Sequence, residues 1–277
     1  MAQSGFDRRR VNGPNESLQP VYDDGIKESN VLYKAWKPGE ARRKRQAKDI
    51  RPICARHTAT PPTPFVTQTV LKTGFIKQAN GSAYIETEHT KVACAVYGPR
   101  QSKSSSYHEI GRLSVEVKFT PFSSLVRRVP IRDAEDRSVA NLIQQALTSS
   151  VRLDLLPKSV IDIFVTVIEC DGIESCIAAA TVAASTSLAK AGIEMLGLVI
   201  SCSGAVVGDD VWLDPNEEET QLASGILLCA CMPALGVMTN VWQTGCLPLA
   251  KAFQSLQLCQ ERCIDIHQIA AQALHED

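Results

Sequence analysis

The feature that most constrains the fold is the run from Cys176 to Lys190, in which nearly every side chain is small. Alanine, serine and threonine dominate it, and it carries no charge before its final lysine. Such a run favours a helix with small residues on almost every face, so neighbouring elements can cover it on all sides. We therefore expect the chain to build around a buried helix, and 277 residues suffice to bury a sizeable core.

Segments of strand character lie on both sides of this run. The earlier ones are separated by glycine and charged turns, as in a meander of antiparallel strands. In one of them Glu116 and Lys118 alternate with apolar residues, which predicts one buried face and one wet face. Another is almost wholly apolar, which is typical of a central position in a sheet. The expected strands are Val70–Ile76, Gly81–Glu86, Thr90–Tyr97, Leu113–Phe119, Val160–Ile168, Leu198–Val207 and Ile226–Met232.

Two more segments have helical periodicity. Apolar residues recur every three or four positions from Val139 to Val151. Leu249–Leu274 resembles a long C-terminal helix with a break near its middle. Strands and helices in this order predict an α/β (α+β) fold in which helices pack on mixed sheets. We place the folded domain at residues 53–277, with halves of roughly 53–190 and 191–277.

Composition narrows the function classes. The formal net charge is −1, so any contact with nucleic acid must come from local clusters or from partner subunits. Hydrophobic residues make up 44% and charged residues 21%, an ordinary globular balance. The sequence contains no uninterrupted run of about 18 apolar residues, so it predicts no membrane span. The polar segment Met1–Arg10 lacks the apolar centre of a signal peptide, which favours a cytosolic or nuclear protein.

Residues 1–52 predict a basic, flexible N-terminal tail, because they are polar and show no sustained hydrophobic period. Three interpretations fit its cluster of positive charge: a solvated linker, a contact with RNA phosphates, or a nuclear-import signal. The clustered residues are Arg42, Arg43, Lys44, Arg45 and Lys48.

The ten cysteines lie mostly inside apolar stretches, where a reduced cysteine behaves as a small hydrophobic residue. Cys259, Cys263 and His267 are spaced by four and so share one face of the predicted C-terminal helix. They could bind a metal, but three ligands on a single helix give poor tetrahedral geometry. We favour buried packing and expect neither a metal nor a cofactor.

Short motifs are distributed over about residues 50 to 235: Asp49–Ile53, Thr73–Gly74, Ala79–Tyr84, Thr90–Val92, Tyr97–Arg100, Gly111–Leu113, Asp171–Gly172, Ala191–Met195, Trp212–Pro215 and Met232–Pro233. In combination they resemble the RNase PH family, which includes bacterial RNase PH, polynucleotide phosphorylase and the six ring subunits of the RNA exosome. The resemblance implies an RNase PH-like fold. The short Gly98–Arg100 turn and the basic pair Arg127–Arg128 point to a ring subunit of the eukaryotic exosome.

The chain departs from the family where phosphate would bind. Active members resembling this chain hold phosphate with arginines on the first long helix and beside an Asp-Gly-Gly turn. The matching positions here carry neutral Gln144 and Gln145, and the turn continues with Ile173 and Glu174. A phosphate site needs cations and N–H donors, so Glu174 would repel the ligand.

The family's catalytic aspartate also has no counterpart. It would stand at the start of the strand near Gly225, and no Asp or Glu occurs between Glu219 and Glu261. We interpret Glu217–Glu219 as a solvated acidic loop. A carboxylate pair cannot act as general acid or metal ligand once one member is glycine. The chain is therefore predicted to have no catalytic residues and not to be an enzyme.

Arginines in loops are the candidates for RNA contacts, because basic loops on a pore wall relieve phosphate repulsion. Arg127 and Arg128 stand first, since adjacent arginines in a loop have no obvious packing role. For Arg100 and Arg112, a hydrogen bond or ion pair at a turn is an equally good explanation. The full set is Arg127, Arg128, Arg132, Arg112 and Arg100.

The resemblance implies a non-catalytic structural subunit of the exosome core ring, which supports 3′-to-5′ processing and degradation of RNA, ribosomal RNA included. The implied partners are other RNase PH-like subunits in a hexameric ring, RNA-binding cap subunits and RNA, in the nucleus, nucleolus and cytoplasm. Two alternatives stay open. One is an active phosphate-dependent 3′–5′ exoribonuclease, and the other is a stand-alone RNA-binding protein that acts through its tail.

Overall fold

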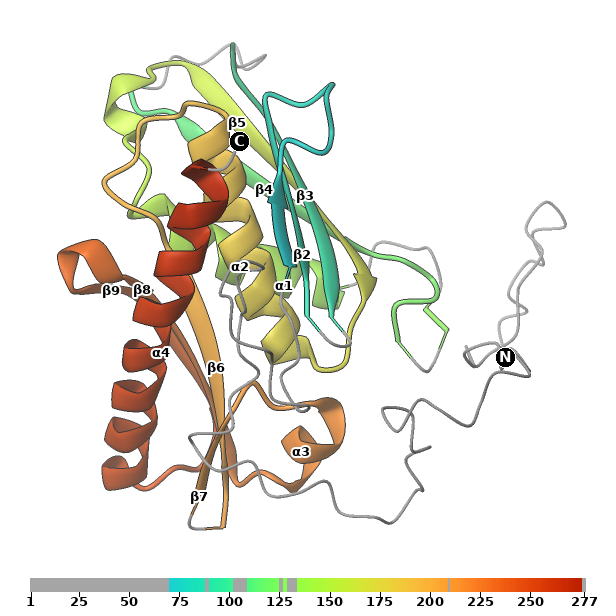
Figure 1. The fold of residues 1–277 in the computed structure, drawn as a ribbon, viewed down its shortest axis with the longest axis vertical. Coiled ribbons are helices and arrows are strands. Elements are labelled where there is room, and N and C mark those ends of the chain that lie inside the picture. The colour runs from blue at the N-terminus through green and yellow to red at the C-terminus, as the bar shows by residue number, and fades with distance from the viewer. Residues whose placement is uncertain are drawn as a thin grey trace, which may run out of the picture.

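A computed structural model of the chain describes residues 70–87, 90–101, 109–124, 127–128, 134–208 and 210–275. Within these ranges the chain forms two β-sheets with helices packed between and beside them (Figure 1). The predicted α+β class, with helices on mixed sheets, is confirmed. The basic tail proposed for residues 1–52 lies outside the described residues.

The first sheet contains β1 (Val70–Thr73), β2 (Gly81–Glu86), β3 (Lys91–Gln101), β4 (Arg112–Phe119) and β5 (Ser159–Glu169). Its order is β1-β2-β3-β5-β4. The first three strands form the predicted antiparallel meander. β5 inserts between β3 and β4, antiparallel to the former and parallel to the latter. The central position predicted for this apolar strand is therefore confirmed.

The second sheet contains β6 (Ile200–Val207), β7 (Asp210–Leu213), β8 (Gly225–Met232) and β9 (Val237–Gly245). Its order is β7-β6-β8-β9, and all its pairs are antiparallel. Every residue of β8 is buried, as expected for an interior strand with no charged side chain.

The helix α2 (Ile173–Lys190) contacts β2 and β3 of the first sheet and β6 of the second. All its residues from Ser175 to Leu188 are buried, which confirms the predicted coverage on all sides. Three of its buried hydroxyl groups are satisfied within the helix: Thr181, Thr186 and Ser187 donate to carbonyl oxygens four residues earlier, at 2.6 to 3.0 Å. Small residues thus allow close approach, and internal hydrogen bonds remove the cost of burying polar atoms.

The remaining elements complete the two layers. α1 (Ala134–Thr148) packs against β4, and α3 (Glu217–Leu222) is a short helix near β6. The C-terminal helix α4 (Leu249–His275) lies along the second sheet, as Figure 1 shows in red and dark orange. Two 3₁₀ turns lie in connections: Leu153–Leu155 between α1 and β5, and Pro233–Leu235 between β8 and β9.

Two cysteines of α4 pack against the second sheet. Cys259 and Cys263 are fully buried, and the Cys263 sulfur lies 3.8 Å from the carbonyl oxygen of Ile200 in β6. His267, the third member of the predicted face, is half-buried. These positions agree with packing of the helix onto the sheet.

Several sequence predictions were wrong in detail. The first strand ends at Thr73 instead of Ile76, because Gly74 adopts a positive φ of 68° that turns the chain. α4 continues from Leu249 to His275 without the expected break. β7, β9 and α3 were not predicted at all.

The close contact between β2 and α2 makes a stability prediction. A Cβ atom on Gly81 would lie 2.1 Å from the carbonyl oxygen of Ser187 and 2.6 Å from the amide nitrogen of Ala191. Gly81→Ala should therefore lower the free energy of unfolding by about 1–3 kcal/mol, measured by urea denaturation. Gly197→Ala is the matched control, because its Cβ would meet only the Met232 sulfur at 3.9 Å. Equal stability of the two variants would contradict this packing.

Candidate nucleic-acid interface

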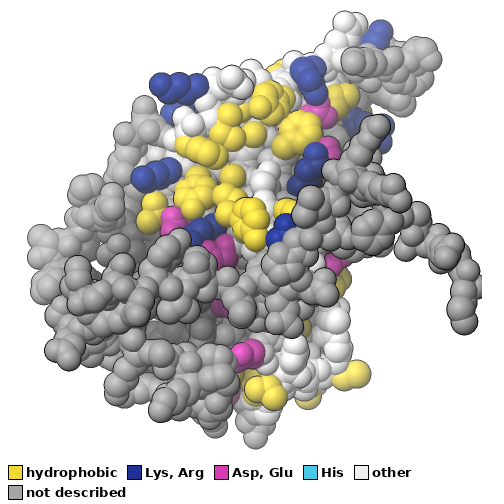
Figure 2. All heavy atoms as spheres, turned by 90° about the vertical axis from the view of Figure 1, so that its right-hand side faces the viewer, with side chains coloured by type: hydrophobic (Ala, Val, Ile, Leu, Met, Phe, Trp, Pro, Cys, Tyr) yellow, Lys and Arg dark blue, Asp and Glu magenta, His cyan; other side chains and the backbone are white. Residues whose placement is uncertain are grey.

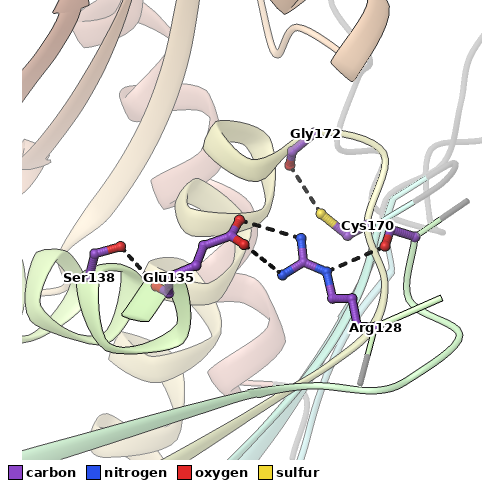
Figure 3. A network of polar contacts seen from close by, with 6 residues as sticks. Arg128, Glu135, Ser138, Cys170 and Gly172 are labelled. Atoms are coloured by element: carbon purple, nitrogen blue, oxygen red, sulfur yellow. Dashed lines mark hydrogen bonds and ion pairs between the residues drawn. The ribbon is translucent and has the colours of Figure 1, made fainter. Parts of the chain in front are cut away.

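The loop between β4 and α1 carries Arg128, whose side chain is only 23% exposed. Its guanidinium donates two hydrogen bonds to the Glu135 carboxylate, at 3.1 and 3.4 Å, and a third to the Ser124 hydroxyl at 3.3 Å. The same group lies 4.2 Å from the centre of the Phe119 ring. Figure 3 shows the paired contacts with Glu135 at the start of α1. Arg128 thus fastens the loop to α1 and to the end of β4.

The expectation that neither adjacent arginine has a packing role is wrong for Arg128. Its neighbour Arg127 is half-buried and has no ion pair or hydrogen bond with any described residue. Arg132 and the basic tail cluster, Arg42 to Lys48, lie outside the described residues. Whether these arginines contact RNA stays a prediction.

The other two candidate arginines belong to the first sheet. Arg100 pairs with Asp162 of β5, as the ion-pair interpretation allowed, whereas Arg112 is exposed at the start of β4. Figure 2 shows the face that carries this sheet, with hydrophobic side chains gathered together and Lys and Arg side chains around them. Aromatic rings also pack in pairs at this sheet: the ring centroids of Phe75 and Tyr84 are 5.9 Å apart, and those of Tyr97 and Phe164 are 5.8 Å apart.

Ion pairs neutralise much of the positive charge on the first sheet. Lys91 lies 2.7 Å from Glu169, and Lys118 lies 3.3 Å from Glu116. Together with the Arg100 pair, these contacts leave few cations for a phosphate backbone. The sheet face is therefore a weaker candidate for RNA than the loop at Arg127.

The N-terminal end of α2, where the family resemblance places a phosphate, is packed against the segment after β7. The Ser175 hydroxyl donates to the carbonyl oxygen of Pro215 at 2.6 Å, and the Glu217 amide donates to the carbonyl oxygen of Asp171 at 2.7 Å. A Cβ atom on Gly172 would lie 2.8 Å from the same Pro215 oxygen. Glycine at position 172 therefore permits this close approach.

Glu174 places a carboxyl group in the first turn of α2. Burial raises the pKa of Glu174, and the charge of Glu135 raises it further, while a backbone hydrogen bond acts in the opposite direction. The carboxyl group of Glu174 therefore opposes the binding of an anion at this helix end, whereas the Glu135 carboxylate is paired with Arg128. Ile173 beside it is exposed.

The two glutamines lie farther along α1. Gln144 donates its amide to the carbonyl oxygen of Leu113 at 3.0 Å, and Gln145 is exposed. Gln144 is about two and a half turns beyond Glu135, the α1 residue whose charge acts on Glu174. Among the described residues, no hydrogen bond or ion pair joins either glutamine to the N-terminal end of α2.

Two cysteines that sequence reasoning passed over lie near Arg128. The Cys170 thiol donates to the carbonyl oxygen of Gly172 at 3.4 Å, as Figure 3 shows. A hydrogen bond with Cys176 lowers the pKa of Cys170, and the Arg128 charge contributes in the same direction. The pKa of buried Cys176 is raised by the same bond and by burial. In the sequence, the only sign that these two cysteines lie close together is that they flank the Asp171–Gly172 turn.

Gly225, at the start of β8, is buried. A Cβ atom there would lie 2.6 Å from Cγ of Leu247 and 3.0 Å from the carbonyl oxygen of Thr244. The space that a longer side chain would occupy is thus filled by an aliphatic residue.

The acidic stretch is not the loop that was expected. Glu217, Glu218 and Glu219 form the first turn of α3, and Glu219 is buried. The Asn216 side chain accepts from the Glu219 amide at 3.1 Å, while the Glu219 carboxylate accepts from the Asn216 amide at 3.0 Å. This reciprocal cap explains one of the three carboxylates as a structural group.

Comparison with known proteins agrees with this geometry. Residues 68–194 match the model of the 3′ exoribonuclease family, domain 1 (RNase PH). The chain is also 33% identical over 263 residues to the exosome complex component mtr3 of Schizosaccharomyces pombe, covering 93% of this chain and 90% of the relative. The chain belongs to the RNase PH family.

Further members of the RNase PH family are similar along much of the chain. The human exosome complex component MTR3 is 31% identical, with 97% of this chain and 94% of the relative covered. The Rrp41 component of Cenarchaeum symbiosum is 31% identical over 73% of this chain and 84% of its own length. The motifs that indicated a ring subunit of the eukaryotic exosome most resemble the subunit called mRNA transport regulator three, and the relatives named mtr3 and MTR3 confirm this resemblance.

Solved structures of RNase PH family proteins share the fold. The crystal structure of rice Rrp46 superposes with a TM-score of 0.65 at 20% identity and covers 74% of this chain and 94% of that chain. The Archaeoglobus fulgidus exosome with RNA bound to the active site gives a TM-score of 0.64 at 16% identity, with 73% of this chain and 87% of that chain covered.

In the described part of the chain, no helix has the length and apolar character needed to cross a membrane.

The contacts of Arg128 separate it from Arg127 in a stability measurement. Arg128→Ala removes the bonds to Glu135 and the ring contact with Phe119, so it should cost about 1 kcal/mol in urea unfolding. Arg127→Ala removes the same charge from the same loop without losing a described contact. It should leave the unfolding midpoint unchanged, and equal losses in both variants would contradict the structural role of Arg128.

The raised pKa of Glu174 predicts a pH-dependent effect. The folded state holds the carboxyl proton at pH values where the unfolded chain has lost it, so folding becomes less favourable as pH rises from about 4.5 through the folded pKa. Glu174→Gln should therefore stabilise the protein at pH 7 relative to wild type, with a smaller gain at pH 4. Urea unfolding at both pH values checks this, with Glu218→Gln in α3 as the control. An equal gain at both values would argue against a buried, charge-opposed carboxyl.

Proposed function

We propose that this chain is a non-catalytic structural subunit of an exosome core ring that supports 3′-to-5′ processing and degradation of RNA. The observation that carries the proposal is its similarity to exosome complex components named mtr3 or MTR3 over 93% and 97% of its length. These relatives are also covered over 90% and 94% of their own lengths, so the similarity extends over nearly the whole of each protein.

The proposed lack of catalysis is supported by two places in the structure. Glu174 sits at the helix end where the resemblance places phosphate, and its charge opposes an anion. Gly225 stands where the resemblance places an aspartate, and Leu247 occupies the adjoining space. Phosphorolysis requires both a held phosphate and a general acid, so either change alone weakens the reaction.

The proposed partners are other RNase PH-like subunits in a hexameric ring, RNA-binding cap subunits, and RNA. Arg127 is the first of the predicted arginines proposed to contact RNA in the channel, because no described residue neutralises it. Arg112 is the second, being exposed at the start of β4. The nucleus, nucleolus and cytoplasm remain the proposed locations, which a fluorescent fusion expressed at native level would test.

Adding inorganic phosphate and end-labelled RNA to the purified full chain tests the absence of catalysis. No shortening of the RNA and no nucleoside diphosphate should be detected, because neither the cation site nor the acid is in place. A phosphate-dependent exoribonuclease run in parallel shows that the conditions support the reaction. Release of nucleoside diphosphate by the chain alone would overturn the proposal.

Removing residues 1–50 distinguishes the scaffold from a stand-alone RNA-binding protein. The truncated chain should still enter a ring reconstituted with RNase PH-like subunits, as judged by native mass spectrometry. Loss of all RNA affinity by a chain that never enters a ring would instead support the stand-alone function.

A further inference from the structure

The strand β9 is an unprotected edge of the second sheet. Its nine residues pair with β8 on one side, and in the described part of the chain no strand pairs with the other side. Apart from the ladder with β8, Val237–Thr244 form no backbone hydrogen bond with any described residue. With respect to the described residues, a row of unpaired N–H and C=O groups about 30 Å long is therefore presented outward.

Proteins normally protect such an edge with charge, proline or brevity. β9 has neither charge nor proline, and no charged residue occurs between Glu219 and Lys251. The other described sheet edges differ. β1 and β7 are only four residues long, and β4 carries Arg112, Glu116 and Lys118.

Exposed apolar side chains gather on and beside this strand. Of the fourteen large hydrophobic side chains that are exposed in the described residues, six lie between positions 235 and 253. When exposed apolar side chains are concentrated in this way on a monomer, we expect a partner to cover them in an assembly. The six are Leu235, Val237, Met238, Val241, Leu249 and Phe253.

The strand is held in place although its edge is open. Trp242 packs against the hydrophobic core, and β9 contacts α1. Val241, by contrast, is 43% exposed. The edge is thus a fixed extended surface that a partner can meet without first ordering it, which lowers the cost of binding.

We infer that the free edge of β9 pairs with an extended strand of a neighbouring ring subunit, which continues the second sheet across the subunit boundary. The inference rests on the proposed ring function and deepens it by assigning the surface. Backbone groups in register specify an extended strand as the partner, and the exposed apolar side chains specify an uncharged one. RNA is disfavoured, because its phosphates require cations that this segment lacks.

The first test uses Val241→Lys in the full chain during reconstitution of the ring. Lysine on an edge strand opposes pairing, so capture of the neighbouring subunit should fall by at least tenfold. Because Val241 is exposed, urea unfolding of the variant should match wild type. Leu222→Lys in α3 is the matched control, since Leu222 is apolar and 71% exposed. It should enter the ring normally.

The second test follows amide hydrogen exchange in wild-type protein, alone and in the ring. Amides of β9 should become slower to exchange on assembly, whereas those of β4, the charged edge of the other sheet, should change less. This measurement does not depend on any variant. Slower exchange at β9 together with loss of capture by Val241→Lys supports strand pairing.

Each other outcome counts against the inference. If wild-type chain enters the ring, and Val241→Lys enters equally with unchanged exchange at β9, the edge assignment fails while the proposed function survives. If wild-type chain never enters a ring, both fail. The isolated chain could instead form a homodimer that Val241→Lys disrupts while ring entry is unaffected. In that case a second copy of this chain would be the partner of β9. Cross-linking of RNA to β9 would overturn the choice of a protein.

Discussion

The burial of α2 between two sheets is the constraint on which the rest of the structure depends. A helix contacted by β2 and β3 on one side and by β6 on another tolerates neither large nor charged side chains along its middle. Small residues bring the sheets close, so that Gly81 lies against the carbonyl of Ser187. The same packing positions the first turn of α2, and with it the Asp171–Gly172 turn and Glu174.

Much of this architecture could be predicted from the sequence. The Ala-rich run determines its own burial, and the apolar segment near Val165 indicates an interior strand, since both signals are local. β9 was missed because Asn240, Gln243 and Gly245 dilute its β-branched residues, although Val237, Thr239 and Val241 alternate as strand residues do. The cap between Asn216 and Glu219 also has a local sequence signal, an asparagine followed three residues later by a glutamate, although a loop was predicted there.

The candidate site was harder to predict, because its decisive contacts join residues far apart in the chain or on different elements. Adjacent arginines look equivalent in sequence, yet Arg128 faces Glu135 and the Phe119 ring while Arg127 has no described ion pair. Nothing near Gly225 in the sequence shows that Leu247 fills the space beside it. The residue type at each candidate position is given by the sequence, whereas the neighbours of that residue are known only from the fold.

The packing at Gly225 has a consequence for how such a protein could change over time. An aspartate at position 225 alone would strike the Leu247 side chain and the Thr244 carbonyl, while a smaller residue at 247 alone would leave a cavity. Each single substitution is thus destabilising, so a carboxylate could be accommodated at position 225 only if both positions changed together. Selection for a stable fold would therefore oppose drift at either position alone.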